Sequence, residues 1–103
     1  MRLILASSSP RRREILARLG LPFETVSPGL EECFRPDRSP REEAAHWAVE
    51  KARAVCRRNP GAVVIGCDTV IDLDGRTLGK PADPEDAVGM LSRLAGREHS
   101  VIT

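Results

Sequence analysis

Short apolar runs alternate along this chain with longer segments that begin with helix-start signals, and this alternation constrains the fold more than any other feature. Apolar runs lie at residues 3–6 and 62–66, and residues 23–26 are a further candidate strand. Each is long enough for a buried strand and too short for a helix. Strands that alternate with helices predict an α/β protein. We therefore expect a mixed sheet with flanking helices.

Three segments begin with a serine or aspartate followed by proline. The side-chain oxygen caps free N–H groups at the start of a helix, and proline fits the first helical position. The second segment also has a capping box, in which Ser39 is followed three residues later by Glu42. Gly20 and Gly96 stand where the first and third helices should end. The expected helices cover residues 10–19, 40–58 and 84–94, and residues 27–39 are expected to form a loop.

Residues 70–73 and 76–78 flank Asp74 and Gly75, and this dipeptide predicts a two-residue hairpin turn because both of its positions tolerate positive φ. The same segment, VIDLDGRTL, resembles the signature of haloacid-dehalogenase-type phosphatases, in which Asp72 would be the nucleophile and Asp74 the acid/base. Arg76 stands where that signature has threonine. The hairpin is therefore the favoured interpretation. Residues 98–103 indicate a last strand.

Charge and composition exclude several classes of function. The 103 residues carry 16 basic and 15 acidic side chains, for a net charge of +1. Proteins that coat nucleic acid or an anionic membrane need a sustained positive excess. Aromatic residues, the stacking platforms of single-strand binders, make up only 3% of the chain. No run approaches the roughly 20 apolar residues of a membrane span. We expect neither nucleic acid nor a membrane as partner.

The three cysteines are odd in number and are not spaced as a CxxC metal clip. Paired disulfides are typical of oxidising compartments. We therefore expect a reduced, cytoplasmic protein. The length fits one domain.

Three consecutive arginines, Arg11 to Arg13, occupy the first turn of the first expected helix. The helix dipole is already positive there, so each cation typically costs about 0.3–1 kcal/mol. The serine cluster before the helix and its free N–H groups would offset this by binding an anion, and phosphate fits best. The alternative is a solvated arginine cluster.

The positions of residues around the first expected helix predict where the Arg12 side chain points. The expected buried face of Ile15, Leu16 and Leu19 is centred close to the direction of Arg12. We therefore expect Arg12 to reach over the carboxyl-terminal edge of the sheet, where α/β proteins bind ligands.

Asp68 follows residues 63–67, so its carboxylate should stand at the end of a central strand. That position favours a metal ligand or a general base, although a turn or cap aspartate is an equal alternative. Glu31 and Glu32 in the preceding loop could add oxygen ligands for Mg²⁺, or could simply be solvated.

Only two of the basic residues are lysines, Lys51 and Lys80, against 14 arginines. Lysine binds phosphate as a compact point charge, whereas arginine presents a planar fork. The two lysines are therefore candidate phosphate contacts. Lysines that extend along apolar surface to reach solvent are the alternative.

Six pieces of the sequence, taken in order, closely resemble the Maf family of nucleoside triphosphate pyrophosphatases. They are LILASSSPRRREIL, the Glu31-Glu32 pair, EKARAV, VIGCDTV, DGRTLGKP and LSRLAGREHSVIT, with nearly collinear spacing. The resemblance implies an α/β fold of the Maf and inosine-triphosphatase type. It also implies a metal-dependent enzyme that cleaves its nucleoside triphosphate substrate between the α- and β-phosphates, releasing a nucleoside monophosphate and pyrophosphate.

The resemblance also implies roles for individual residues. Asp68 would be the catalytic proton acceptor, and Glu32 and Asp68 would hold a divalent cation, Mg²⁺ or alternatively Mn²⁺. Arg11 and Thr69 match the branch that prefers dTTP and UTP, whereas the 7-methyl-GTP branch has SPWRR and DQ. The residues implied to bind the triphosphate are Ser7, Ser9, Arg11, Arg12, Lys51 and Lys80.

Maf domains are roughly twice as long as this chain, and the resemblance covers only their N-terminal half. We therefore expect residues 1–103 to be the N-terminal half of a single Maf-like domain, apparently truncated. A non-catalytic nucleotide- or phosphate-binding remnant is the alternative to an active enzyme. The resemblance to Maf proteins also implies a homodimer.

Overall fold

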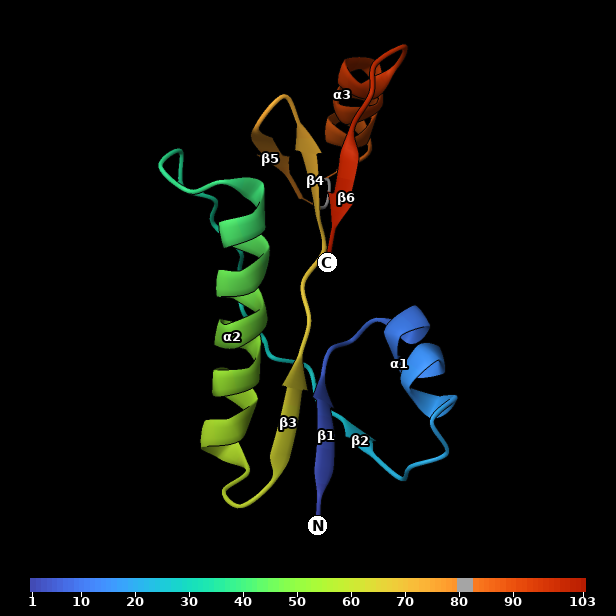
Figure 1. The fold of residues 1–103 in the computed structure, drawn as a ribbon, viewed down its shortest axis with the longest axis vertical. Helices are drawn as coiled ribbons and strands as arrows, with labels where there is room; N and C mark the ends of the chain where they lie inside the picture. The colour runs from blue at the N-terminus through green and yellow to red at the C-terminus, as the bar shows by residue number, and fades with distance from the viewer. Residues whose placement is uncertain (80–82) are drawn as a thin grey trace. The chain divides into compact units, whose positions relative to one another are not determined.

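A computed structural model describes residues 1–79 and 83–103, and the chain divides into two compact units (Figure 1). Unit 1 comprises Met1–Glu32 and His46–Cys67, and unit 2 comprises Cys33–Ala45 and Asp68–Thr103. Each unit has its own three-stranded sheet. Among the described residues, no helix has the length and apolarity needed to cross a membrane.

Unit 1 contains a parallel sheet in the order β2-β1-β3. Its strands are β1 (Leu3–Ala6), β2 (Glu24–Thr25) and β3 (Val63–Gly66), and helix α1 (Pro10–Ala17) connects β1 to β2. Ala6 pairs with Gly66 in the register between β1 and β3. Because parallel strands end at the same edge, the residues that follow β1 and β3 emerge side by side.

Helix α2 (Pro40–Arg58) packs against β3 through its residues in unit 1 (Figure 1). A Cβ at Gly66 would collide with the Ala48 carbonyl oxygen and lie 2.9 Å from the Ala52 Cβ. Glycine at this position therefore allows the close approach. The buried core below the contact comprises Ile4, Ala6 and Val55, with Val26, Ala62 and Val64 packed against it.

The edge strand of unit 1 is fastened by an exposed ion pair. The Arg2 guanidinium donates hydrogen bonds of 2.8 and 3.2 Å to the Glu24 carboxylate. These hydrogen bonds hold the pKa of Glu24 below its ordinary value. Arg2 also donates to the Asn59 side chain, over 3.2 Å, so it links the β1 segment to the residue that follows α2.

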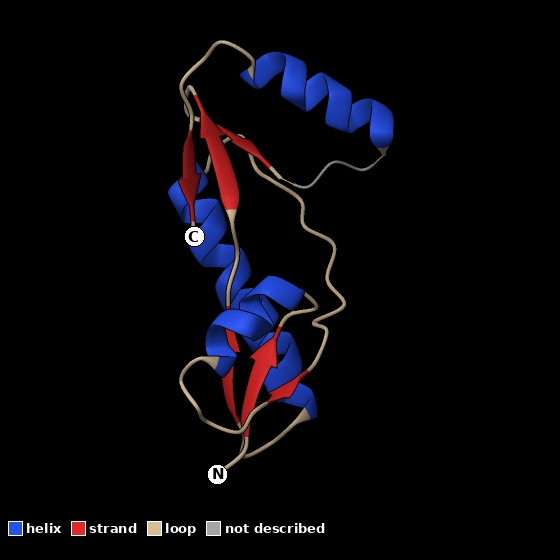
Figure 2. Cartoon of the chain, turned by 90° about the vertical axis from the view of Figure 1, so that its right-hand side faces the viewer, coloured by secondary structure: helices blue, strands red, loops and turns tan. Residues whose placement is uncertain are grey.

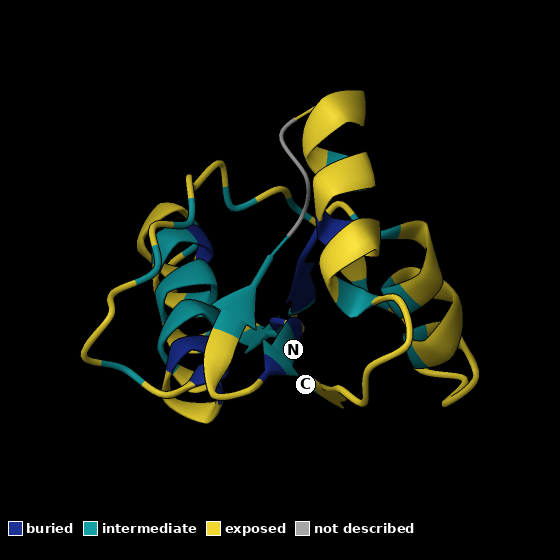
Figure 3. Cartoon of the chain, turned by 90° about the horizontal axis from the view of Figure 1, so that it is seen from above, coloured by how far each residue is buried: buried dark blue, intermediate teal, exposed yellow. Residues whose placement is uncertain are grey.

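The prediction that Ile15, Leu16 and Leu19 form a buried face is wrong. Ile15 is 51% exposed, Leu19 is 66% exposed, and no residue of α1 is buried. An apolar stripe is buried only where another element covers it, and no described element of unit 1 covers this one. Figure 3, coloured by burial, shows that much of the helical surface of the chain is exposed or only partly buried.

Unit 2 contains an antiparallel sheet in the order β5-β4-β6. Its strands are β4 (Val70–Leu73), β5 (Arg76–Leu78) and β6 (Ser100–Ile102), and helix α3 (Pro84–Leu94) precedes β6. The predicted hairpin turn is confirmed, because Asp74 and Gly75 have φ values of 52° and 80°.

The α/β class is confirmed, but the parallel and antiparallel pairs lie in two sheets rather than in one mixed sheet. Figure 2 draws the strands of both sheets in red. Only residues 67–69 separate β3 from β4, and these two strands do not pair. This short connection contains no glycine or proline that would favour a tight turn. The chain therefore leaves the first sheet and begins a second one.

Candidate functional site

The serine-rich loop between β1 and α1 is fastened by its own hydroxyl groups. Ser7 is only 7% exposed, and its hydroxyl accepts a hydrogen bond of 3.1 Å from the Ser9 backbone N–H. Ser9 is the N-cap of α1, and its hydroxyl accepts from the Arg12 backbone N–H over 3.3 Å. The loop therefore holds a fixed backbone at the start of the helix, where the dipole favours an anion.

Arg12 reaches the carboxyl-terminal edge of the sheet in unit 1, as predicted. Its Nη1 donates a hydrogen bond of 3.1 Å to the carbonyl oxygen of Cys67, the residue that follows β3. Arg11 and Arg13 are exposed. Consecutive residues of a helix point in different directions, so the three arginines do not share one environment.

A small cavity of about 100 Å³ adjoins the serine loop. It is lined by Ser7, Ser8, Ser9, Pro10, Arg13 and Thr25. Pockets for drug-sized ligands have volumes of about 300–1,000 Å³, so this cavity is too small to hold a whole nucleotide. Arg13 and Thr25 were missed by sequence reasoning. Arg13 follows Arg11 and Arg12, which match the family motif, and no motif in the sequence includes Thr25.

Glu32 and Lys51 are brought together in unit 1. Lys51 Nζ lies 2.5 Å from Glu32 Oε1, and both side chains are largely buried. Lys51 thus forms an ion pair rather than extending into solvent, whereas Glu31 is exposed. One predicted metal carboxylate and one predicted phosphate lysine therefore lie in contact.

Asp68 begins unit 2 and is only 3% exposed. The next residue, Thr69, is exposed, and its hydroxyl is hydrogen-bonded to the Thr103 hydroxyl over 3.1 Å. Val70 pairs with Ile102 in the adjacent ladder, so this contact extends the pairing of β4 with β6. The backbone on the carboxyl-terminal side of Asp68 is therefore held by the sheet.

Carboxylate oxygens are the ligand type that a hard divalent cation takes. Within residues 1–79 and 83–103, no cluster of three or more histidine, cysteine, aspartate or glutamate side chains could form a full protein cage. Mg²⁺ does not need one, because it commonly binds one or two carboxylates and completes its shell with water and substrate phosphates. Glu32 carries a carboxylate in unit 1, and Asp68 carries one in unit 2.

Two further sequence hypotheses have different outcomes. Lys80 lies outside the described residues, so its predicted phosphate contact stays a prediction. The phosphatase-like aspartates serve the hairpin instead. Asp72 Oδ1 accepts a hydrogen bond of 2.8 Å from the Gly75 N–H, and Asp74 forms an ion pair with Arg97.

Comparisons with known proteins agree with these features. The family model described as Maf-like protein matches residues 2–103. The dTTP/UTP pyrophosphatase of Symbiobacterium thermophilum is 52% identical over 101 residues, covering 98% of this chain and 52% of the relative. That of Bacillus velezensis is 51% identical over 102 residues, covering 99% and 54%. That of Desulfotalea psychrophila is 48% identical, covering 98% and 52%.

The chain thus spans about half the length of the curated relatives that it matches. The match nevertheless includes every segment that carries a candidate site residue. The matched residues 2–103 include the serine loop, the loop that contains Glu31 and Glu32, helix α2, and the strand that ends before Asp68. The chain belongs to the Maf family.

Proposed function

We propose that this chain acts in a nucleoside triphosphate pyrophosphatase that hydrolyses dTTP- and UTP-type nucleotides to a nucleoside monophosphate and pyrophosphate. The observation that carries the proposal is the fastened serine loop at the start of α1, with Arg12 at the adjacent strand end. Relatives named dTTP/UTP pyrophosphatase, about half identical over nearly the whole chain, support the same reaction.

In this proposal, the triphosphate binds to groups that match its charge. The positive end of the α1 dipole would attract the phosphates, and the hydroxyls of Ser7 and Ser9 would donate hydrogen bonds to phosphate oxygens. Cationic side chains would neutralise the charge that develops on the departing pyrophosphate. These side chains are those of Arg11, Arg12, Lys51 and Lys80.

Asp68 would act as the general base. Its carboxylate would accept a proton from a water molecule as the water oxygen attacks the α-phosphorus in line with the bond to the bridging oxygen. That bond would break as the new one forms, and the bridging oxygen would leave with pyrophosphate. Glu32 and Asp68 would hold Mg²⁺, which when bound supplies positive charge to the phosphates.

Arg11 and Thr69 support the pyrimidine preference, because they match the dTTP/UTP branch of the family. Thr69 directly follows the proposed base, and Arg11 lies in the first turn of α1. We assign both to substrate selection.

The test is pyrophosphate release from dTTP and UTP by the purified chain with Mg²⁺. We expect Asp68→Asn to lower turnover by about 10²–10⁴-fold, the usual contribution of a general base. Asp74→Asn is the matched control, since Asp74 lies in an exposed turn, and it should leave turnover unchanged. Unchanged turnover in Asp68→Asn would refute the assigned base. Loss of turnover in Asp74→Asn would instead favour the phosphatase interpretation.

A second candidate is a non-catalytic nucleotide-binding fragment. It is favoured by one observation, that the chain covers 52% of the length of the Symbiobacterium relative. Saturable binding of dTTP without pyrophosphate release would support this second function over the first.

The proposal also includes a cytoplasmic location and a homodimer. Three free cysteines, Cys33, Cys56 and Cys67, support a reducing compartment. Exposed apolar side chains on α1 and α3 support contact between copies.

A further inference from the structure

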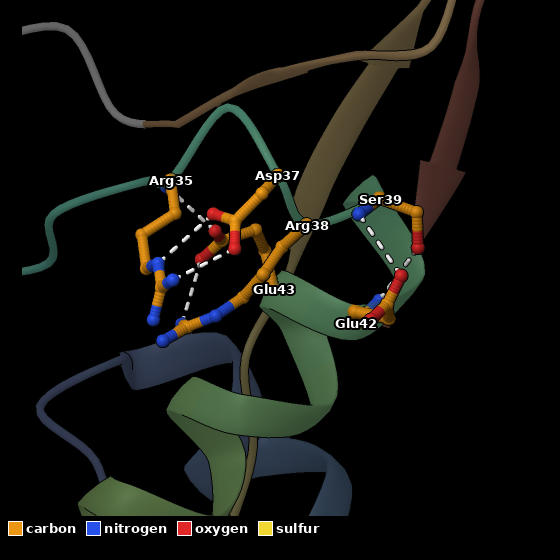
Figure 4. Close-up of polar contacts among 6 residues, drawn as sticks. All are labelled: Arg35, Asp37, Arg38, Ser39, Glu42 and Glu43. Atoms are coloured by element: carbon orange, nitrogen blue, oxygen red, sulfur yellow. Dashed lines mark hydrogen bonds and ion pairs between the residues drawn. The ribbon is translucent and has the colours of Figure 1, made fainter.

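Glu43 lies in the first turn of α2, and its side chain has no exposed surface. Its Oε1 accepts a hydrogen bond of 2.7 Å from the Arg35 backbone N–H, and its Oε2 lies 3.5 Å from Arg38 Nη1 (Figure 4). A buried ion pair often adds no more stability than well-packed apolar residues of similar volume. What these contacts hold in place therefore matters more than the pair itself.

The contacts of Glu43 hold a closed turn. The Arg38 N–H donates a hydrogen bond of 3.2 Å to the Arg35 carbonyl oxygen. The Arg35 guanidinium is bidentate to Asp37, with distances of 2.9 and 2.7 Å. Glu43 thus fastens the whole turn at residues 35–38 to α2, all within unit 2 (Figure 4).

The neighbouring Glu42 provides an internal comparison. Its carboxylate accepts a hydrogen bond of 3.2 Å from the Ser39 N–H, and the Ser39 hydroxyl accepts one of 3.2 Å from the Glu42 N–H. This capping box is exposed and ends at Ser39 (Figure 4). Glu42 and Glu43 therefore share one helical turn, but only Glu43 contacts residues 35 and 38 in the described hydrogen bonds and ion pairs.

The fastened turn continues directly into an aromatic contact. Phe34 lies against Gly79, where an added Cβ would be 2.6 Å from Phe34 Cε2 and 2.8 Å from Cζ. Gly79 directly precedes Lys80 in the sequence, and Phe34 follows Glu32 by two positions. The turn is thus connected through the chain to Glu32, which the proposed function assigns to the metal.

We propose that Glu43 is a positioning residue of the nucleotide site. By fastening the turn at residues 35–38, it keeps Phe34 against Gly79 and so fixes the backbone that leads to Glu32. This inference rests on the proposed function. Glu43 acts through the loop and makes no contact with the nucleotide.

The test measures binding of a non-hydrolysable α,β-imido analogue of dTTP with Mg²⁺ to the 103-residue chain by calorimetry. We expect Glu43→Ala to raise the Kd about tenfold, while Glu42→Ala stays within about twofold. Glu43→Gln should weaken binding less than Glu43→Ala, because its amide oxygen still accepts from the Arg35 N–H. Thermal melts followed by circular dichroism confirm that each variant is folded at the measuring temperature.

Gly79→Ala tests the same contact from the other side and carries the test if Glu43→Ala does not fold. It should also raise the Kd, because its methyl group displaces the Phe34 ring. If both changes act through one contact, the double variant is no weaker than the weaker-binding single variant.

The outcomes separate the two levels of the argument. A wild-type chain that binds no analogue overturns the proposed function, and this inference with it. A wild-type chain that binds, with Glu43→Ala and Gly79→Ala binding equally well, overturns the inference alone. If the effects of Glu43→Ala and Gly79→Ala on the free energy of binding are fully additive, the two residues do not act through the contact between Phe34 and Gly79.

Discussion

Arg12 differs from the two neighbouring arginines because its guanidinium is engaged by the backbone at the end of β3. The amino-acid sequence alone indicates an anion site here, because three cations in a first helical turn are unfavourable without one. The expected direction of Arg12 is confirmed although the buried face used to derive it is wrong. The spacing of residues along the helix was enough to predict the direction of the Arg12 side chain. Burial of the apolar face of α1 depends instead on other elements that cover the helix.

Arg12→Ala should weaken binding of the dTTP analogue by about tenfold or more, since a hydrogen bond to a charged group contributes roughly 1.5–3 kcal/mol. Calorimetric titration with Mg²⁺ measures the change. Arg18→Ala is the matched control, because Arg18 is exposed at the other end of α1, and its Kd should stay near the wild-type value. Equal loss in both variants would mean that general charge, rather than the position of Arg12, governs binding.

The starts of the helices could be predicted well because local chemistry determines them, whereas α1 ends at Ala17, two residues before the expected end at residue 19. Proline and a capping side chain begin α1, α2 and α3 where expected, and positive φ at Gly20 and Gly96 follows the first and third. The contact between Glu32 and Lys51 could not be predicted in this way, since it joins residues 19 positions apart across a loop and a helix. Only the packing of that loop brings the two charges together.

The packing of α2 on β3 makes a prediction about two glycines. Gly66→Ala should lower the free energy of unfolding by about 1–3 kcal/mol, the usual effect of overpacking, because its Cβ would collide with the Ala48 carbonyl oxygen. Urea denaturation measures the change.

Gly89→Ala is the matched control for this prediction. Gly89 lies within α3, and an added Cβ there meets nothing within 4 Å. This change should raise the free energy of unfolding by about 0.5–1 kcal/mol through helix propensity. If Gly66→Ala also stabilised the chain, the close approach of α2 to β3 would be refuted.

At the scale of the whole chain, each unit exposes apolar side chains. Leu19 of unit 1 and Leu91 of unit 2 are both 66% exposed, and each lies near other exposed apolar residues in sequence. The alternation of apolar runs predicted which segments form strands and helices. It could not predict that the strands divide between two sheets, because pairing depends on contacts distant in sequence.

The exposed apolar residues predict concentration-dependent self-association of the 103-residue chain. Sedimentation velocity over a range of concentrations should show a dimer or larger species. Leu19→Gln or Leu91→Gln should shift this equilibrium toward monomer, and Arg93→Gln, a change on exposed polar surface of α3, should not. A wild-type chain that stays monomeric throughout would contradict the prediction.

The hydroxyl groups of Ser7 and Ser9 have a consequence for how fast an anion can be captured. Because they already bond to backbone N–H groups, the loop has lost its conformational freedom during folding. A phosphate that binds here displaces water from side chains that are already in position, and the backbone of the loop does not have to rearrange. Capture is then governed by diffusion and electrostatic attraction, and it should slow with rising ionic strength as salt screens the arginines around the loop.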